Sequence, residues 1–378
     1  MSSKRLKSNV RKPWAMYVYI AGDNNLSTAG LVDISEMEKA GANQDRHVAI
    51  QIDTEGEHEG SIRYEISEPD FEGRSHRTVI NRLPEQNTGN PRYLASFVKW
   101  ASKRYPATNK ILVVWNHGAG FMHTPTKDIG YDDSSEGDAL TMGELRWSLT
   151  NSGLGNGNQK KFAIIGFDAC LMNMVEVAYE FLDLTEFVVG SQQTEPGDGW
   201  PYDKVIESLN ANESTSSVAS KIVQAYINSY KSTGTDGVTQ SALKLSAMPA
   251  LGKSIDALGN ALSAVLDSNR NLITEARVKT QSYEEPTYVD LVDLASNLSA
   301  KVKNANVRSA CTSVRESVDK VVVSESSYGK SVSRSTGLSI WFPLLKTDYV
   351  TRRGEYTSLR YSRQFKGWTM FLDAMLAE

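Results

Sequence analysis

The feature that most constrains the fold is a set of short, nearly uninterrupted apolar segments that alternate with stretches of helical spacing. The apolar segments are Trp14–Ala21, His47–Asp53, Lys110–Trp115, Lys161–Phe167 and Phe187–Ser191. Strands that are apolar at almost every position are typical of parallel strands buried on both faces. Because helices are expected between them, over 31–40, 91–105 and 171–182, the pattern predicts a doubly wound α/β sheet with right-handed crossovers.

The second half of the chain has a different pattern. After Asp203 helical spacing dominates, and the elements expected there are helices over 215–233, 247–267, 289–304 and 363–376 and strands over 238–246 and 337–342. Shorter apolar runs at 61–65 and 77–80 predict an edge hairpin or extra strands. We therefore divide the chain into three parts: a basic, disordered leader (1–13), a core (14–205), and a mainly helical C-terminal region (206–378) that packs on the core and contributes strands.

Charge and composition narrow the range of partners and compartments. The 378 residues carry a net charge of −4, so nothing favours nucleic acid or an anionic membrane as a partner. No apolar run approaches the roughly 20 residues that span a bilayer. The basic N-terminus lacks the apolar region of a secretory signal, and two cysteines, Cys170 and Cys311, do not suggest a disulfide framework. We expect a cytoplasmic protein, or a secreted one if a signal peptide has been removed.

Two reactive side chains follow the ends of predicted strands. His117 lies just after 110–115, and Cys170 lies just after 161–167. Ligands bind at the carboxyl ends of strands in open α/β sheets, so a thiol and an imidazole on neighbouring strands would form a nucleophile–base pair. We expect Cys170 to open the following helix, where the helix dipole favours the thiolate. The backbone N–H groups of Gly118 and Cys170 are candidates for an oxyanion hole.

Each of these residues also has a structural interpretation. A cysteine after a buried strand is most often a small core residue, and a lone histidine at a strand end is often a satisfied polar residue. The 53 residues from His117 to Cys170 resemble the caspase spacing of about 50, which favours the catalytic interpretation. A different α/β hydrolase or a nucleotide-binding enzyme lacks support, because the sequence has no Gly-x-Ser-x-Gly elbow, phosphate loop or Gly-x-Gly-x-x-Gly motif after a strand.

Several segments resemble the clostripain-like cysteine peptidases, which are relatives of caspases, gingipains and legumains. They are Tyr17–Leu26 (YVYIAGDNNL), Val114–Gly120 (VWNHGAG), Tyr131–Leu145 (YDDSSEGDALTMGEL), Ile165–Asn173 (IGFDACLMN) and Ser191–Tyr202 (SQQTEPGDGWPY). They follow the family order and span about half of the chain. The resemblance implies a caspase-like three-layer α/β/α sandwich with a mostly parallel central sheet, a catalytic core over 14–205, and a Cys–His dyad formed by Cys170 and His117.

The resemblance also implies cleavage of peptide bonds after basic residues, with Arg preferred over Lys. A pocket for a guanidinium group needs a carboxylate, and the family's acidic pocket positions correspond to Asp168 and Asp198. Alternatively, Asp168 could have a structural role as an acceptor for backbone N–H groups, and Asp198 could be a turn residue. Thr194 and Glu195 are weaker candidates for substrate contact. The resemblance implies no third catalytic residue, and we interpret 23–26 as a turn and helix cap.

Members of the family are typically made as zymogens and cut between the histidine and the cysteine. Lys127, in the long loop after His117, is the expected processing site; Lys160 and Lys161 are the other candidates. Cleavage could occur in cis or through an upstream activating protease. The expected partners are protein or peptide substrates with Arg or Lys at the cleavage site. The alternative hypothesis is a catalytically silent caspase-like scaffold or signalling module.

No cofactor is expected to be required. Clostripain itself is associated with calcium, so the resemblance allows for a bound calcium ion, and Asp132, Asp133 and Asp138 form an acidic cluster reminiscent of calcium loops. Their spacing does not match an EF-hand, and the remaining histidines have no metal-ligand spacing. The sequence therefore predicts no metal site.

Overall fold

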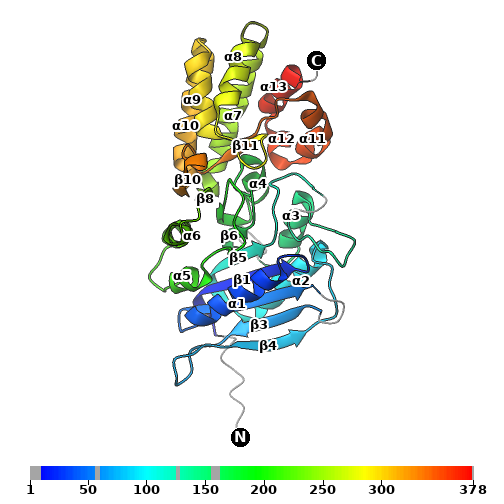
Figure 1. Cartoon of the computed structure of the whole chain (residues 1–378), viewed down its shortest axis with the longest axis vertical. Helices are drawn as coiled ribbons and strands as arrows, with labels where there is room; N and C mark the ends of the chain where they lie inside the picture. Colours follow the sequence, from blue (N-terminus) through cyan, green and yellow to red (C-terminus); the bar gives the residue numbers. More distant parts are fainter. Residues whose placement is uncertain (1–9, 56–59, 125–127, 155–161, 377–378) are drawn as a thin grey trace.

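The computed structural model describes residues 10–55, 60–124, 128–154 and 162–376 (Figure 1). Its centre is a nine-stranded sheet in the order β10–β8–β7–β6–β5–β1–β2–β3–β4. The five middle strands are parallel: β2 (Arg46–Thr54), β1 (Lys12–Gly22), β5 (Ala107–Trp115), β6 (Phe162–Asp168) and β7 (Thr185–Gly190). These are the five apolar segments of the sequence, so the predicted parallel sheet is confirmed.

Antiparallel strands extend the sheet at both edges. At one edge, β3 (Ile62–Ile66) pairs with β2 and with β4 (Arg77–Arg82), which is the predicted edge hairpin. At the other edge, β8 (Val238–Lys244) pairs with β7 and with β10 (Val322–Tyr328). The C-terminal region therefore supplies two strands of the same sheet.

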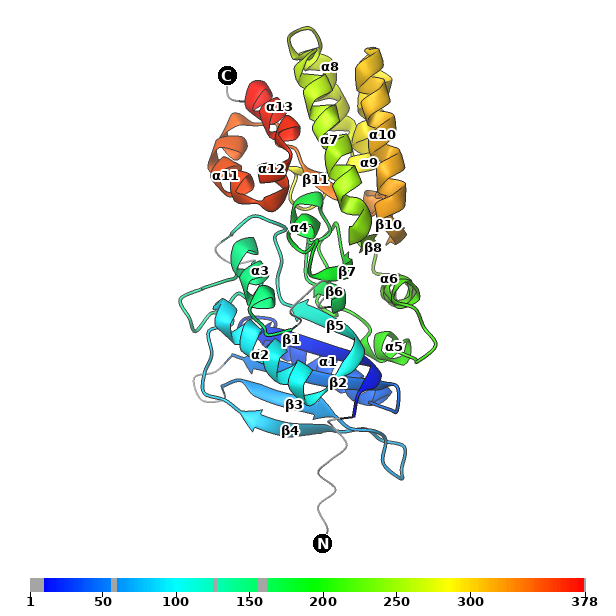
Figure 2. The same ribbon diagram turned by 180° about the vertical axis from the view of Figure 1, so that it is seen from behind.

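Helices cover both faces of the sheet, as the opposite views in Figures 1 and 2 show. Alternate residues of β1 point to opposite layers: Met16 and Val18 pack in one apolar cluster, and Tyr17 and Tyr19 in the other. The first cluster includes residues of α1 (Ser27–Ala40), α5 (Tyr202–Glu207) and α6 (Thr215–Thr233); the second includes residues of α2 (Pro91–Arg104), α3 (Met142–Thr150) and α4 (Val175–Glu180). The three-layer α/β/α sandwich is confirmed.

The rest of the C-terminal region extends from the β8–β10 edge (Figure 2). It contains α7 (Met248–Ser263), α8 (Leu266–Lys279), α9 (Leu291–Lys301), α10 (Ala305–Val321), α11 (Lys346–Ser358), α12 (Arg360–Gln364) and α13 (Lys366–Leu376). The strand expected over 337–342 is β11 (Ser339–Trp341), which pairs with β9 (Tyr288–Asp290) in a separate two-stranded sheet. Among the described helices, none is both long and apolar enough to cross a membrane.

Two predicted boundaries differ from the structure. Strand β1 begins at Lys12, within the predicted leader, because Lys12 pairs with Ala107 of β5. The helix expected over 171–182 is only α4, which begins at Val175. Leu171 has a φ of 65°, so the chain turns sharply after Cys170 and cannot continue as a helix there. Cys170 therefore does not open a helix, and the predicted effect of a helix dipole on its thiol was wrong.

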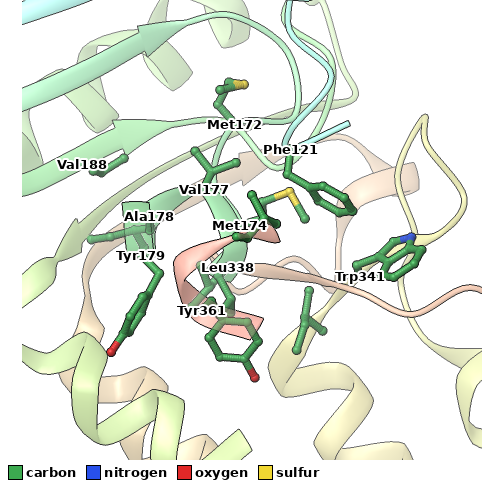
Figure 3. Close-up of a cluster of buried hydrophobic side chains, with 14 of the residues drawn as sticks. Phe121, Met172, Met174, Val177, Ala178, Tyr179, Val188, Leu338, Trp341 and Tyr361 are labelled. Carbon is green, nitrogen blue, oxygen red and sulfur yellow. The ribbon is translucent and has the colours of Figure 1, made fainter. Parts of the chain in front are cut away.

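The turn after Cys170 is held by the C-terminal region. Both the backbone N–H and the hydroxyl of Ser339 donate to the Asn173 carbonyl, at 3.1 and 3.2 Å. Figure 3 shows the apolar side of this contact, where Met172 and Met174 lie among buried side chains that include Phe121 and Trp341. The rings of Phe121 and Trp341 are 5.5 Å apart between centroids. The conformation of the loop after β6 is thus fixed by residues nearly 170 positions away in the sequence.

Candidate active site

Cys170 and His117 lie at the same edge of the sheet because β5 and β6 are neighbours. The last register pair of these parallel strands joins Trp115 to Asp168, so the two residues that follow each strand emerge at the same edge. Both Cys170 and His117 line one cavity of about 130 Å³, which we call the catalytic cavity. The sequence-based expectation that the two side chains share one edge of the sheet therefore agrees with the geometry.

Gly118 packs directly against the backbone of Cys170. A Cβ atom on Gly118 would lie 2.3 Å from the Cys170 carbonyl oxygen and 2.9 Å from its backbone nitrogen. Such distances exclude any side chain, so glycine is required for this close approach. The backbone nitrogen of Cys170 and residue Gly118, the two parts of the expected oxyanion hole, thus lie side by side.

The thiol of Cys170 is partly exposed and is held by the loop after β7. The backbone N–H of Glu195 donates to Cys170 Sγ at 3.2 Å, and the N–H of Leu171 donates to the Gln193 carbonyl at 3.1 Å. Leu171 is one of only two non-glycine residues with positive φ in the described chain. A leucine in this region costs roughly 1–3 kcal/mol, and such strain clusters at functional sites. This turn aims the sulfur into the catalytic cavity.

His117 contacts a residue that the sequence analysis did not assign to the site. Asn25 Oδ1 lies 2.8 Å from His117 Nε2. Because a side-chain carbonyl only accepts, this contact is a hydrogen bond in the tautomer whose Nε2 carries the proton, and in that tautomer Nδ1 is the basic nitrogen. The neighbouring Asn116 accepts from the His117 N–H and donates to the carbonyls of Ala21 and Tyr131. The histidine is therefore anchored to the loop after β1.

The interpretation of 23–26 as a turn and helix cap is only half right. Asn24 Oδ1 accepts from the Leu26 N–H at 2.9 Å, which makes the turn, but no side chain caps the start of α1. The segment follows β1, which is the neighbour of β5, so its position at the carboxyl edge was the available signal for Asn25.

Asp168 and Glu195 form an acidic wall of the catalytic cavity. Asp168 is 4% exposed, and its Oδ2 accepts from Tyr202 Oη at 2.8 Å and from the Trp200 N–H at 3.2 Å. Burial raises the pKa of Asp168 to about 6, while hydrogen bonds from Tyr202 and Glu195 oppose the rise. Burial and the Asp168 charge raise the pKa of Glu195 well above its ordinary value. Of the two carboxyl groups, Glu195 is therefore the one whose protonated form is favoured more strongly.

Asp198 and Thr194 do not line the catalytic cavity. Asp198 is exposed and lies at a neighbouring cavity of about 300 Å³ that also includes Asp33 and Glu36. Gly199 separates the two cavities, since a Cβ atom there would lie 3.0 Å from Asp168 Oδ2 and 3.2 Å from Asp33 Oδ2. Burial, and next the Asp168 charge, raise the pKa of Asp33 to about 9. Asp168 and Asp198 therefore line two adjoining cavities, and their assignment to one pocket for a basic side chain stays a prediction.

Two other expectations concern the long loop after His117. Lys127 lies outside the described residues, as do Lys160 and Lys161. The acidic cluster of Asp132, Asp133 and Asp138 does not converge: Asp133 accepts from Tyr131 Oη at 3.0 Å, and Asp138 accepts from Asn87 Nδ2 at 2.7 Å. These three residues are therefore not a set of metal ligands.

A thiol and an imidazole at the ends of adjacent parallel strands, within a three-layer α/β/α sandwich, define the class of caspase-like cysteine peptidases. Within it, the chain belongs to the clostripain family, whose family model matches residues 18–376. Clostripain from Hathewaya histolytica is 27% identical over 246 residues, which cover 57% of this chain and 45% of that protein. The match thus spans less than half the length of this relative.

Solved structures share the fold over nearly the whole chain. One is a secreted C11 cysteine protease from Bacteroides thetaiotaomicron in complex with an irreversible peptide inhibitor, with a TM-score of 0.73, 22% identity, and coverage of 96% of this chain and 99% of that one. Another is an inactive zymogen C11 protease from Parabacteroides distasonis, with a TM-score of 0.74, 20% identity, and coverage of 94% and 99%. At these identities the likeness establishes a common fold.

Proposed function

We propose that this chain is a cysteine endopeptidase that cleaves peptide bonds after basic residues, with Arg preferred over Lys. The observation that carries the proposal is that Cys170 and His117 line one cavity together with the acidic pair of Asp168, which is buried, and Glu195, which is partly buried. Cys170 and His117 would act as the nucleophile and the base of peptide hydrolysis, and the acidic wall would favour a substrate with a cationic side chain.

In the proposed reaction, His117 Nδ1 accepts the proton of the Cys170 thiol, and the sulfur attacks the carbonyl carbon of the scissile bond. The new C–S bond gives a tetrahedral intermediate, whose oxyanion we assign to the backbone N–H groups of Gly118 and Cys170. Collapse of the intermediate breaks the C–N bond, and the imidazolium gives its proton to the leaving amine. Water, deprotonated by His117, then hydrolyses the thioester and restores the thiol.

The proposed preference for Arg follows from the protonation of the acidic pair. Two carboxyl groups that share one proton present one net negative charge, which matches one guanidinium group. A planar guanidinium group makes charge-assisted bonds to two acceptors at once, whereas an ammonium group acts as a point charge. We therefore assign substrate binding chiefly to Asp168 and Glu195. Asp198 and Thr194 would contact only a longer substrate.

A panel of short fluorogenic peptides tests the function. Peptides that end in Arg, Lys, citrulline or Asp before the leaving group are compared, because citrulline keeps the shape of Arg without its charge. We expect turnover in the order Arg, then Lys, with citrulline and Asp far below. Cleavage after Asp but not after Arg would overturn the pocket assignment. An absence of cleavage, even after the loop 118–140 is cut deliberately, would favour the silent scaffold.

We propose Asn25 as a positioning residue for His117. The Asn25→Ala variant removes the 2.8 Å contact to Nε2 and should lower kcat for the Arg peptide by about 10- to 100-fold with little change in KM, because a misoriented base slows proton transfer. The matched variant Asn25→Asp keeps an acceptor oxygen, so it should recover most of the kcat that Asn25→Ala loses. A loss of thermal stability in Asn25→Ala, with kcat per folded molecule unchanged, would contradict the positioning role.

We also propose that the chain is made as a zymogen and cut in the loop after His117, with Lys127 as the expected site. Support comes from the basic specificity proposed above and from the structural neighbour that is described as an inactive zymogen. The intact mass of purified wild type should show two fragments, whereas Cys170→Ala should remain a single chain. Fragments in both proteins would indicate an upstream protease, and a single chain in both would rule out self-processing.

The proposed partners are protein or peptide substrates with Arg or Lys at the cleavage site. We retain the cytoplasm as the proposed location because the two cysteines do not form a disulfide, which suits a reducing compartment. Two of the similar solved structures are described as secreted proteases, so localisation of the tagged full-length protein is the direct test.

A further inference from the structure

Gln240 is a buried amide side chain that lies between two apolar residues on one face of β8. It is 1% exposed. Alternate residues of a strand point to the same side, so Gln240 shares its face with Val238 and Ala242, which both pack in the apolar cluster that includes α6. A buried amide is costly unless its polar atoms find partners, so the partners of Gln240 indicate what this side chain does there.

The amide donor of Gln240 is used by the acidic wall of the catalytic cavity. Gln240 Nε2 donates to Glu195 Oε1 at 3.3 Å, which joins β8 to the loop after β7. Gln240 Oε1 is buried and has no hydrogen-bond partner among the described residues. The side chain therefore serves Glu195 rather than the packing of the sheet, although a residue of this size between Val238 and Ala242 could have been apolar.

Glu195 has no cationic side chain to hold it. Among the described residues, no Lys or Arg side chain forms an ion pair with Glu195. The titratable groups that act on it, or on which it acts, are all acids: Asp168, Cys170, Tyr202, Tyr226 and Tyr230. Burial and the Asp168 charge raise the pKa of Glu195, whereas the bond from Gln240 opposes the rise. Gln240 is thus a neutral donor in surroundings that otherwise disfavour the carboxylate.

The bond from Gln240 also fixes the orientation of the Glu195 carboxyl group. An amide N–H only donates, so Oε1 is held as an acceptor whether Glu195 is charged or neutral. The Glu195 side chain hydrogen-bonds to Asp168 as well. The carboxyl group is therefore held from two sides, by Gln240 on β8 and by Asp168 at the end of β6, while Asp168 and Glu195 both line the catalytic cavity.

We propose that Gln240 is a positioning residue that sets the preference for Arg over Lys, because it fixes the Glu195 carboxyl group beside Asp168 as a second acceptor for the substrate side chain. A guanidinium group donates to two acceptors in a rigid fork, whereas the donors of an ammonium group rotate to suit a single acceptor. A loose second acceptor should therefore weaken an Arg substrate more than a Lys substrate. This inference rests on the proposed function, in which the acidic wall binds the basic side chain.

Turnover of the Arg, Lys and citrulline peptides by Gln240→Met tests this role. Methionine keeps the length of the side chain and suits an apolar cluster, but it cannot donate to Glu195. We expect kcat/KM for the Arg peptide to fall about tenfold, chiefly through KM, as for the loss of one hydrogen bond to a charged group. The Lys peptide should lose no more than about threefold, and the citrulline peptide should stay within about twofold of wild type. Gln240→Asn, whose amide is one methylene too short to reach Glu195, should have the same effect and covers the case in which Gln240→Met does not fold.

A matched control and a double variant complete the test. Gln281 is another buried amide, which donates to the carbonyls of Ser282 and Ser331 in the C-terminal region, so Gln281→Met should keep the wild-type ratio of Arg to Lys turnover. Glu195→Gln should itself lower this ratio, and the addition of Gln240→Met should lower it no further, because Gln240 acts through Glu195.

The outcomes separate this inference from the proposed function. Equal losses with all three peptides, or additive losses in the double variant, would overturn the positioning role of Gln240. A preference for Arg that Gln240→Met and Gln240→Asn both retain would overturn it too, and would leave the proposed function intact. A wild-type protein that does not prefer the Arg peptide would refute the proposed function, and the role of Gln240 with it.

Discussion

Replacement of Cys170 by alanine should lower kcat for an Arg peptide by about 10⁵-fold or more, because no other described group at the catalytic cavity can form the covalent intermediate. The variant should fold normally, since the smaller side chain adds no polar group and gives up a weak bond from the Glu195 N–H to the sulfur. Initial rates with the fluorogenic Arg peptide, at equal concentrations of folded protein, provide the measurement.

Cys311 offers the matched control for this experiment. It is fully buried in α10, and burial raises the pKa of its thiol to about 12, so it carries almost no thiolate at neutral pH. Cys311→Ala should therefore retain wild-type kcat, with at most a small loss of stability from the lost packing. A large loss of activity in Cys311→Ala, or retained activity in Cys170→Ala, would contradict the assignment of the nucleophile.

Asp168→Asn should lower kcat/KM for the Arg peptide by about 10²- to 10³-fold and leave kcat/KM for the citrulline peptide within a few fold of wild type. Loss of one member of a buried, hydrogen-bonded charge pair typically costs about 2–5 kcal/mol. An asparagine can still accept from the Trp200 N–H and from Tyr202, so the fold around the cavity should persist. An equal loss with both peptides would indicate a structural role, as an acceptor for backbone N–H groups.

The same pair of peptides should separate the pH dependence of Asp168 from that of the catalytic residues. Because burial raises the pKa of Asp168 to about 6, its carboxyl group is neutral below that pH and charged above it. For wild type, kcat/KM for the Arg peptide should therefore rise through pH 6 relative to kcat/KM for the citrulline peptide. In Asp168→Asn this ratio should not change between pH 5 and 7, and a persistent rise would exclude Asp168 as its source.

The strands and the shared position of His117 and Cys170 could be predicted because each depends on local signals. Segments such as 110–115 are apolar on both faces, which only a central strand satisfies, and His117 and Cys170 each follow such a strand. The short helix α4 could not be predicted, because positive φ at Leu171 is imposed by tertiary contacts. These contacts include the bonds from Asn173 Nδ2 to Ser241 and from Ser339 to the Asn173 carbonyl.

For the acidic residues, too, features that depend on tertiary structure could not be predicted from the sequence. Asp168 could be assigned to the pocket because it lies two residues before the nucleophile at a strand end. The raised pKa values of Asp168 and Glu195 come chiefly from burial, which no spacing reveals. Asp23, Glu85 and Asp132 come from three separate loops, so the convergence of their carboxylates could be recognised only after these loops were placed in space.

The direct pairing of β5 with β6 has a consequence for any cleaved form of the enzyme. The chain between these strands contains every expected processing site, yet the strands themselves are joined from Ile111 with Ile164 to Trp115 with Asp168 in the middle of the sheet. A cut in that connection would divide the polypeptide between its two reactive groups without separating them. The mature enzyme would then be a permanent two-piece assembly, whose fragments part only when the protein is denatured.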